Sequence, residues 1–170
     1  MATFADKLKR QWRHWSTLTA ATRRAFPPDA LAAITGAIKA GEQGHRSELR
    51  LIVETALPMQ AIWRGATTRQ RALALFAEYG VWDTADNCGV LIYVNLADRK
   101  VEIVADRMVD QVIGAELWRE VCQGMTAGFA QGRFQASTLA AIVMVNGLLR
   151  DHFPSSGPRP NELPDQPVML

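Results

Sequence analysis

Hydrophobic and polar residues alternate along the chain in blocks typical of a protein that mixes strands and helices. The segment 47–54 alternates leucine and valine with polar residues, which predicts a strand with one buried and one partly wet face. The run 90–95 is almost continuously apolar, which predicts a central strand covered on both faces. A hairpin then leads into 101–106, which alternates again and predicts a third strand.

Helical periodicity fills the segments around these strands. Helices are predicted from Pro28 to about Lys39, from Thr67 to Tyr79, from about 115 to 131, and from Ser137 to about His152. The last is apolar nearly all round, so we expect it to be buried. The order α-β-α-β-β-α-α predicts an α/β fold with a mixed sheet layered between helices.

The two ends of the chain differ from this middle part, and they divide it into an arm (1–26), a domain (27–153) and a tail (154–170). Residues 1–26 carry six basic residues against one acidic residue, a local charge of +5, although the whole chain carries only +2. The tail is rich in proline and serine, which predicts disorder. We therefore expect one compact domain with two unlike extensions.

The arm has an amphipathic pattern. One face of a predicted helix collects its large apolar residues, with Arg10 and Arg13 on other faces. These apolar residues are Phe4, Leu8, Trp12, Trp15 and Leu18. Such a face can dock on the domain or on a second subunit, and a basic helix with tryptophans can also lie on an anionic membrane. The sequence leaves both interpretations open and favours docking.

Composition limits the class of protein. An apolar content of 48% with 21% charged residues is ordinary for a globular domain of this size. The longest nearly uncharged apolar run, 139–149, is shorter than the roughly 20 residues that cross a bilayer, and the charged N-terminal segment does not resemble a secretory signal. Cys88 and Cys122 are expected to be reduced thiols. We therefore expect a cytoplasmic protein, with the arm offering peripheral contact to the inner membrane.

The segment 81–107, VWDTADNCGVLIYVNLADRKVEIVADR, closely resembles the signature of TPM domains. It runs from an Asp-Asn pair through a glycine and a buried strand to a hairpin that ends in ADR. The flanking segments 45–58 and 132–154 follow the order of the same family. This family includes thylakoid-lumen photosystem repair proteins and many bacterial proteins, and the resemblance covers roughly three quarters of the chain.

The resemblance implies a three-layer α/β/α sandwich around a small central sheet. Better-known members carry a signal peptide, a membrane span and often a glycine-rich tail, so this sequence is similar to a short, soluble bacterial branch that lacks them. Acid phosphatase activity has been attributed to plant relatives, and calcium binding to some domains. Both enter here as expectations implied by the family.

Carboxylates gather around the predicted hairpin. If hairpin partners have numbers that sum to about 197, Asp106 lies opposite Leu91 or its neighbours, near the start of the central strand. Asp83, Asp86 and Asn87 precede that strand, and Asp110 follows the hairpin. Oxygen ligands of this kind suit Ca²⁺ or Mg²⁺, so these five residues form a candidate metal site.

A purely structural role explains the same residues and is favoured by the sequence. Asp83 or Asp86 would cap a turn, Asp106 would pair with Arg107 or Arg99, and Asn87 would shape the turn into the strand. Asp83 or Asp86 could also attack a phosphoryl group held by Arg107, but the spacing does not require it.

The remaining catalytic templates are missing from the sequence. It contains no GxGxxG, P-loop, HExxH or GxSxG motif. His14, His45 and His152 are isolated and are expected at the surface or an interface. Nucleic-acid binding is disfavoured, because basic residues and aromatics meet only in the arm. The leading hypothesis is a non-catalytic binding or scaffold module that acts on a protein partner or on copies of itself. The alternative is a weak metal-dependent acid phosphatase.

Overall fold

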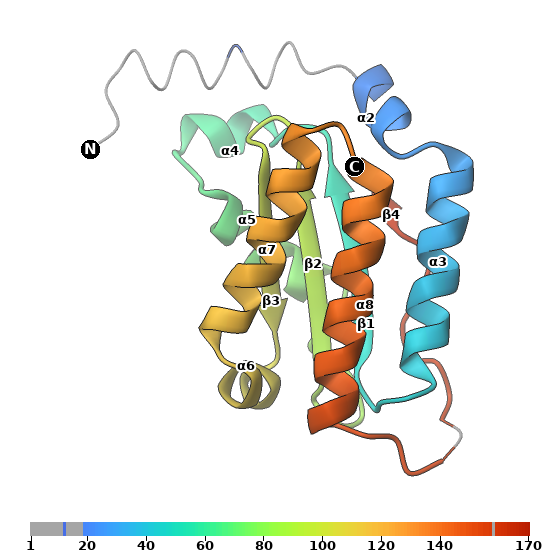
Figure 1. Ribbon diagram of the computed structural model, residues 1–170. Coiled ribbons are helices and arrows are strands. Elements are labelled where there is room, and N and C mark those ends of the chain that lie inside the picture. The colour runs from blue at the N-terminus through green and yellow to red at the C-terminus, as the bar shows by residue number, and fades with distance from the viewer. Residues whose placement is uncertain (1–11, 13–18, 158) are drawn as a thin grey trace.

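The computed structural model describes Trp12 and residues 19–157 and 159–170 (Figure 1). Over these residues, the centre of the molecule is a four-stranded sheet in the order β3-β2-β1-β4. The strands are β1 (Glu48–Glu54), β2 (Gly89–Asn95), β3 (Lys100–Ala105) and β4 (Val168–Met169). β1 runs parallel to β2 and β4, whereas β2 and β3 are antiparallel, which confirms the predicted mixed sheet.

Helices cover both faces of this sheet. α3, α7 and α8 pack on one face and α5 packs on the other (Figure 1). The helices of the described residues are α2 (Thr19–Ala25), α3 (Pro28–Glu42), α4 (Met59–Trp63), α5 (Thr68–Glu78), α6 (Arg107–Ile113), α7 (Ala115–Ala130) and α8 (Phe134–His152). The α/β fold class and the three-layer α/β/α sandwich are therefore confirmed.

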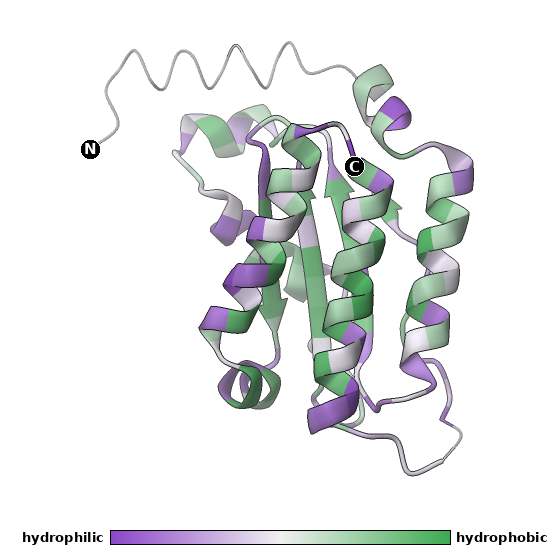
Figure 2. Ribbon diagram, viewed as in Figure 1, coloured by the Kyte–Doolittle hydropathy of each residue, from purple (hydrophilic) through white to green (hydrophobic). Residues whose placement is uncertain are grey.

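The main core lies between the sheet and α3, α7 and α8. Apolar residues dominate β2 and the inner sides of these helices (Figure 2). Every residue of β2 is buried, as its continuous apolar run predicts. α8 is less buried than expected, because Val143 is 67% exposed. α8 therefore carries more apolar residues than the core can cover.

Two short helices were not predicted. α4 follows Pro58, and α6 follows the hairpin directly, with Asp106 at its N-cap position. Each spans less than two full turns of α-helix, too short for a helical period to show in the sequence. α5 begins where expected, because Thr67 and Gln70 form a capping box.

The hairpin register differs from the expected one by two in the sum of partner numbers. Leu91 pairs with Val104, so Asp106 lies beside Gly89. Asn95 pairs with Lys100, and its side-chain oxygen accepts the Asp98 N–H at 2.9 Å. The turn is thus centred earlier than predicted.

The predicted disorder of the tail, 154–170, is wrong for the described residues. The chain passes behind α3 in Figure 1, beside the β1 edge of the sheet, and ends as β4 paired with β1. This explains why all seven residues of β1 are buried, whereas one partly wet face was expected. Low apolar content did not prevent order, since the segment docks through backbone and charged groups.

Candidate functional site

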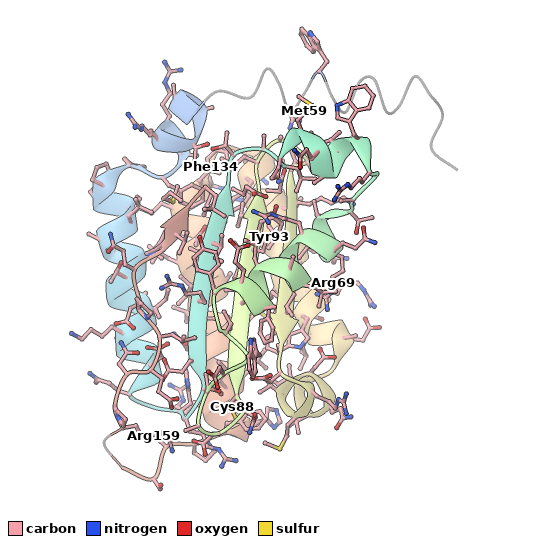
Figure 3. The ribbon with its side chains drawn as sticks, turned by 180° about the vertical axis from the view of Figure 1, so that it is seen from behind. Met59, Arg69, Cys88, Tyr93, Phe134 and Arg159 are labelled. Carbon is pink, nitrogen blue, oxygen red and sulfur yellow. The ribbon has the colours of Figure 1, made fainter. Side chains whose placement is uncertain are left out.

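We call the end of the sheet where β1 and β2 begin the amino end, and the opposite end the carboxyl end. The predicted carboxylate site falls at the amino end, because β3 finishes there beside the start of β2. Cys88 and Arg159 mark this end in Figure 3, and Met59 marks the carboxyl end. The position of each predicted residue is therefore given relative to these two ends.

Asp106 is bonded to the protein backbone. Its Oδ2 accepts the N–H of Gly89 at 2.7 Å, and its own N–H donates to the Gly89 carbonyl at 2.9 Å. Burial raises the pKa of the Asp106 carboxyl. The side chain therefore joins the end of β3 to the start of β2, a structural role different from the predicted pairing with Arg107 or Arg99.

Gly89 is needed at this junction. A Cβ placed on Gly89 would lie 1.8 Å from the carbonyl oxygen of Val81 and 3.2 Å from Oδ2 of Asp106. The loop before β2 thus runs directly over the strand's first residue. This close approach explains the glycine that follows the Asp-Asn pair in the sequence.

Asp86 forms an ion pair with Arg159, which comes from residues 159–170, here called the C-terminal segment. Asn87 follows in a left-handed conformation with φ of 50°, and its N–H donates to the Thr84 carbonyl at 3.0 Å. Asparagine tolerates this conformation better than most residues. Asn87 therefore shapes the turn into β2, and Asp86 anchors a distant part of the chain.

The other two predicted ligands stand apart. Asp83 is exposed, as is Asp110 on α6. Among the residues that the structure describes, no three His, Cys, Asp or Glu side chains form a group that could hold a metal ion. Since Asp86 and Asp106 also have protein partners, the five residues do not fit one Ca²⁺ or Mg²⁺ site as they stand, and metal binding remains a prediction.

A cavity of about 610 Å³ opens beside these residues at the amino end. Its walls come from the end of α3, the following loop and the C-terminal part of the chain from Ser155 to Asp165. Its lining carries charges of both signs, including Lys39, Glu42, Arg46, Glu48, Arg159 and Asp165. Sequence reasoning missed this cavity, because half of its wall is the segment that was expected to be disordered.

Glu42 is the most perturbed acid in this cavity. Its Oε1 accepts the Leu49 N–H at 2.8 Å, and its carboxyl shares a hydrogen bond with Asp165. Burial, followed by the charges of Glu48 and Asp165, raises the pKa of Glu42 to about 8. Near neutral pH Glu42 therefore keeps its proton, and it loses the proton at mildly alkaline pH.

His45 was expected at the surface or an interface, but it is buried inside the chain beside the same cavity. Its Nδ1 accepts the Ser47 N–H at 3.3 Å, so Nε2 carries the proton and donates to Oδ1 of Asn146 at 3.1 Å. Burial lowers the pKa of His45. The ring is thus a neutral link between the β1 entry and α8.

A second polar group at the carboxyl end was not predicted. Glu54, at the end of β1, accepts hydrogen bonds from Arg71 at 2.8 Å and from the Tyr93 hydroxyl at 2.5 Å. Asn95, at the end of β2, donates to the same hydroxyl at 2.9 Å. Glu54 and Asn95 are both the last residues of neighbouring parallel strands, which is the sequence signal that could have found them.

The arm can be tested only in part. Arg10, Arg13 and Trp15 lie outside the described residues, whereas Trp12 is helical and 68% exposed. α2 ends the arm with Arg23 and Arg24 exposed in its last turn. A search of the described helices finds none with the length and apolarity needed to span a bilayer.

Comparisons with known proteins agree with this architecture. The structure is similar to the NMR structure of the BA42 protein from the psychrophilic bacterium Bizionia argentinensis, with a TM-score of 0.73 and 24% sequence identity. The similarity covers 84% of this chain and 93% of that one. No protein of curated function is similar enough to count as a match. Residues 21–148, well over half of the chain, match the TPM domain, and the chain therefore belongs to the TPM domain family.

Proposed function

We propose that this TPM domain is a non-catalytic binding module that acts on partner proteins through the carboxyl end of its sheet. The observation that carries the proposal is the exposure of two large apolar side chains on α4. Met59 is 43% exposed and Trp63 is 72% exposed. They lie four residues apart, so they occupy one face of the helix. Exposed tryptophan and methionine are enriched at protein interfaces.

The state of the carboxylates supports binding over hydrolysis. A hydrolase needs a nucleophile or a metal-bound water that is free to meet its substrate. Asp86 is paired with Arg159, and Asp106 accepts the Gly89 N–H. Both are engaged in holding the loop, the hairpin and the C-terminal segment together. The geometry gives the phosphatase alternative no favouring contact.

Site-specific photo-cross-linking tests the binding surface. A photoreactive phenylalanine analogue replaces Trp63 in one variant and Val143 in the other, in cells that naturally make the protein. Val143 is a matched control, because it is an apolar residue on α8 that is 67% exposed. We expect a discrete cross-linked protein from position 63 and none from position 143. Equal patterns from both positions would overturn the proposal.

A phosphatase assay tests the non-catalytic part separately. The full chain and its Asp86→Asn and Asp106→Asn variants are incubated with a generic phosphomonoester, with and without Ca²⁺ or Mg²⁺. We expect the same background rate in all samples. A metal-dependent rate that one substitution abolishes would contradict the proposal and revive the hydrolase alternative.

The arm supports a further contact with an anionic membrane. Exposed Trp12 and the exposed Arg23 and Arg24 supply the apolar and cationic groups that such a contact uses. The full chain is expected to sediment with anionic vesicles. A variant without residues 1–18 is expected to stay in the supernatant. Equal sedimentation of the two proteins would exclude this role for the arm.

A further inference from the structure

The C-terminal segment, residues 159–170, follows the edge of β1. It starts at the amino end, where Arg159 pairs with Asp86, and finishes as β4 at the carboxyl end (Figure 3). In β4, Val168 and Met169 align with Ile52 and Val53. The segment therefore lies along β1 as an added strand with an extended approach.

Two buried charged side chains of β1 hold this segment by its backbone. Arg50 donates from Nη1 to the carbonyls of Pro164 and Gln166, the latter at 3.1 Å. Glu48 accepts the Leu163 N–H at 3.2 Å on Oε2. Both side chains come from residues that are only 8% exposed. Arg50 supplies donors and Glu48 supplies an acceptor, so together they bind the carbonyl and N–H groups of an extended backbone.

Main-chain bonds continue this contact to the last residue. The Leu170 N–H donates to the Val53 carbonyl at 2.9 Å, and the Thr55 N–H donates to the Leu170 carbonyl at 2.8 Å. Leu163 and Val168 are the apolar residues of the segment that pack against the cluster around Tyr93. The contact therefore combines backbone pairing with two apolar anchors, which is how proteins bind peptides by strand addition.

The segment itself has the composition of a peptide ligand. It contains Pro160, Pro164 and Pro167, which restrict the backbone and leave fewer N–H groups to satisfy. Leu163 and Val168 are only partly buried, and the ladder to β1 is two residues long. Segments with few buried apolar contacts open at low free energy. This segment is therefore bound, but its detachment should require less free energy than the opening of β2 or β3.

We propose that the edge of β1 is a binding groove for an extended, proline-containing peptide of a partner protein, with residues 159–170 occupying it as an internal ligand. The partner peptide has apolar residues in the places of Leu163 and Val168 and a free backbone between them. Arg50 and Glu48 hold that backbone. This groove is separate from the α4 surface, so the proposal goes beyond the proposed function and does not rest on it.

Anisotropy of a labelled synthetic peptide with the sequence of residues 159–170 tests the groove. The internal ligand is weakened in the full chain by Leu163→Asp with Val168→Asp, which leaves the β1 residues unchanged. We expect saturable binding to this variant and at least about ten-fold weaker binding to the wild-type chain, whose own segment competes. A peptide that carries the same two substitutions serves as the control and is expected not to bind.

Further substitutions separate this groove from the α4 surface. Adding Arg50→Met to the opened variant is expected to weaken peptide binding at least about ten-fold, and adding Trp63→Ala is expected to leave it unchanged. A folded opened variant that does not bind the peptide, or binds it equally well without Arg50, would overturn the proposal. If the wild-type chain is a dimer that dissociates when the segment is weakened, the groove is occupied by a second copy of the chain. That result would overturn the proposal of a partner peptide.

Hydrogen exchange on the unmodified chain keeps the proposal testable if the opened variant does not fold. The Leu163 and Leu170 amides are expected to exchange much faster than the Ile92 amide in β2, because the segment detaches before the sheet unfolds. Equal protection at these positions would show that the segment is an integral strand and would contradict an exchangeable ligand.

Discussion

The two faces of the sheet are stabilised by different chemistry. The face toward α3, α7 and α8 is almost entirely apolar, with residues such as Ile92 and Ile142 fully buried. The face toward α5 and the C-terminal segment has a smaller apolar cluster, and it also buries Glu54, Arg50 and the Tyr93 hydroxyl. The first face gains stability from area removed from water, and the second face depends on partners for its polar groups.

The two faces should therefore respond differently to pH and to a competing ligand. Hydrophobic contacts respond little to pH, whereas buried acids and their partners respond strongly. The buried charges Glu48 and Arg50 on this polar face hold the C-terminal segment, and Glu48 also lines the amino-end cavity. The apolar face is thus a constant scaffold, and the polar face is the part that pH or a competing peptide can change.

The apolar face should show the largest loss of stability on truncation. Ile142→Ala removes a fully buried side chain of α8 and leaves a cavity, so we expect the free energy of unfolding to fall by about 2–5 kcal/mol. Chemical denaturation followed by tryptophan fluorescence measures it. Val143→Ala is the neighbouring control, because Val143 is 67% exposed and its truncation should cost less than about 0.5 kcal/mol.

The polar face should lose less when one hydroxyl is removed. Tyr93→Phe leaves Glu54 and Asn95 without their shared partner, so we expect a loss of about 1–3 kcal/mol in the free energy of unfolding. In a double-mutant cycle with Glu54→Gln, the two losses should not add. Additive losses would mean that the network does not act as a unit.

Glu42 should make the folded protein less stable as pH rises. Its pKa is about 8 in the folded protein and near 4.5 in the unfolded chain, so the folded state holds the proton between these values. This stabilisation is complete below pH 4.5 and is lost as pH rises toward 8, at up to about 1.4 kcal/mol per pH unit. Glu42→Gln, which stays neutral, is expected to flatten the fall in melting curves. An unchanged slope would contradict this assignment.

The smallest expected effect is at the cap of α5, which covers the polar face. Thr67 accepts the Gln70 N–H at 3.1 Å, so Thr67→Ala is expected to cost about 1 kcal/mol. Thermal unfolding of Thr67→Ala beside Thr67→Ser measures the cap, since serine keeps the acceptor. A serine variant that is as unstable as the alanine variant would show that the hydroxyl is not the cause.

Local pattern was enough to predict the hairpin and the helices of three turns or more. The continuous apolar run of β2 predicted burial on both faces, and Thr67 predicted the start of α5. Both signals arise from neighbours in the sequence. α4 and α6 were missed, because fewer than two full turns give no period.

The sequence predicted which end of the sheet Asp86 and Asp106 occupy, but it did not predict their partners. Asp86 and Asp106 do lie at the amino end, as the hairpin predicted. Their partners are Arg159, more than seventy residues later, and the backbone of Gly89. No local pattern carries a contact of that length. The grouping of five ligands therefore could not be tested without the fold.

The sequence by itself determined the family, through the TPM signature of residues 81–107. It also determined the three longer strands, the long helices and the apolar core, because alternation and helical period are properties of neighbouring residues. Only the tertiary structure decided that the C-terminal segment is bound and that it forms a wall of the amino-end cavity. Polar segments give little hydrophobic signal, and their order depends on partners such as Arg50 and Glu48 that fold elsewhere in the chain.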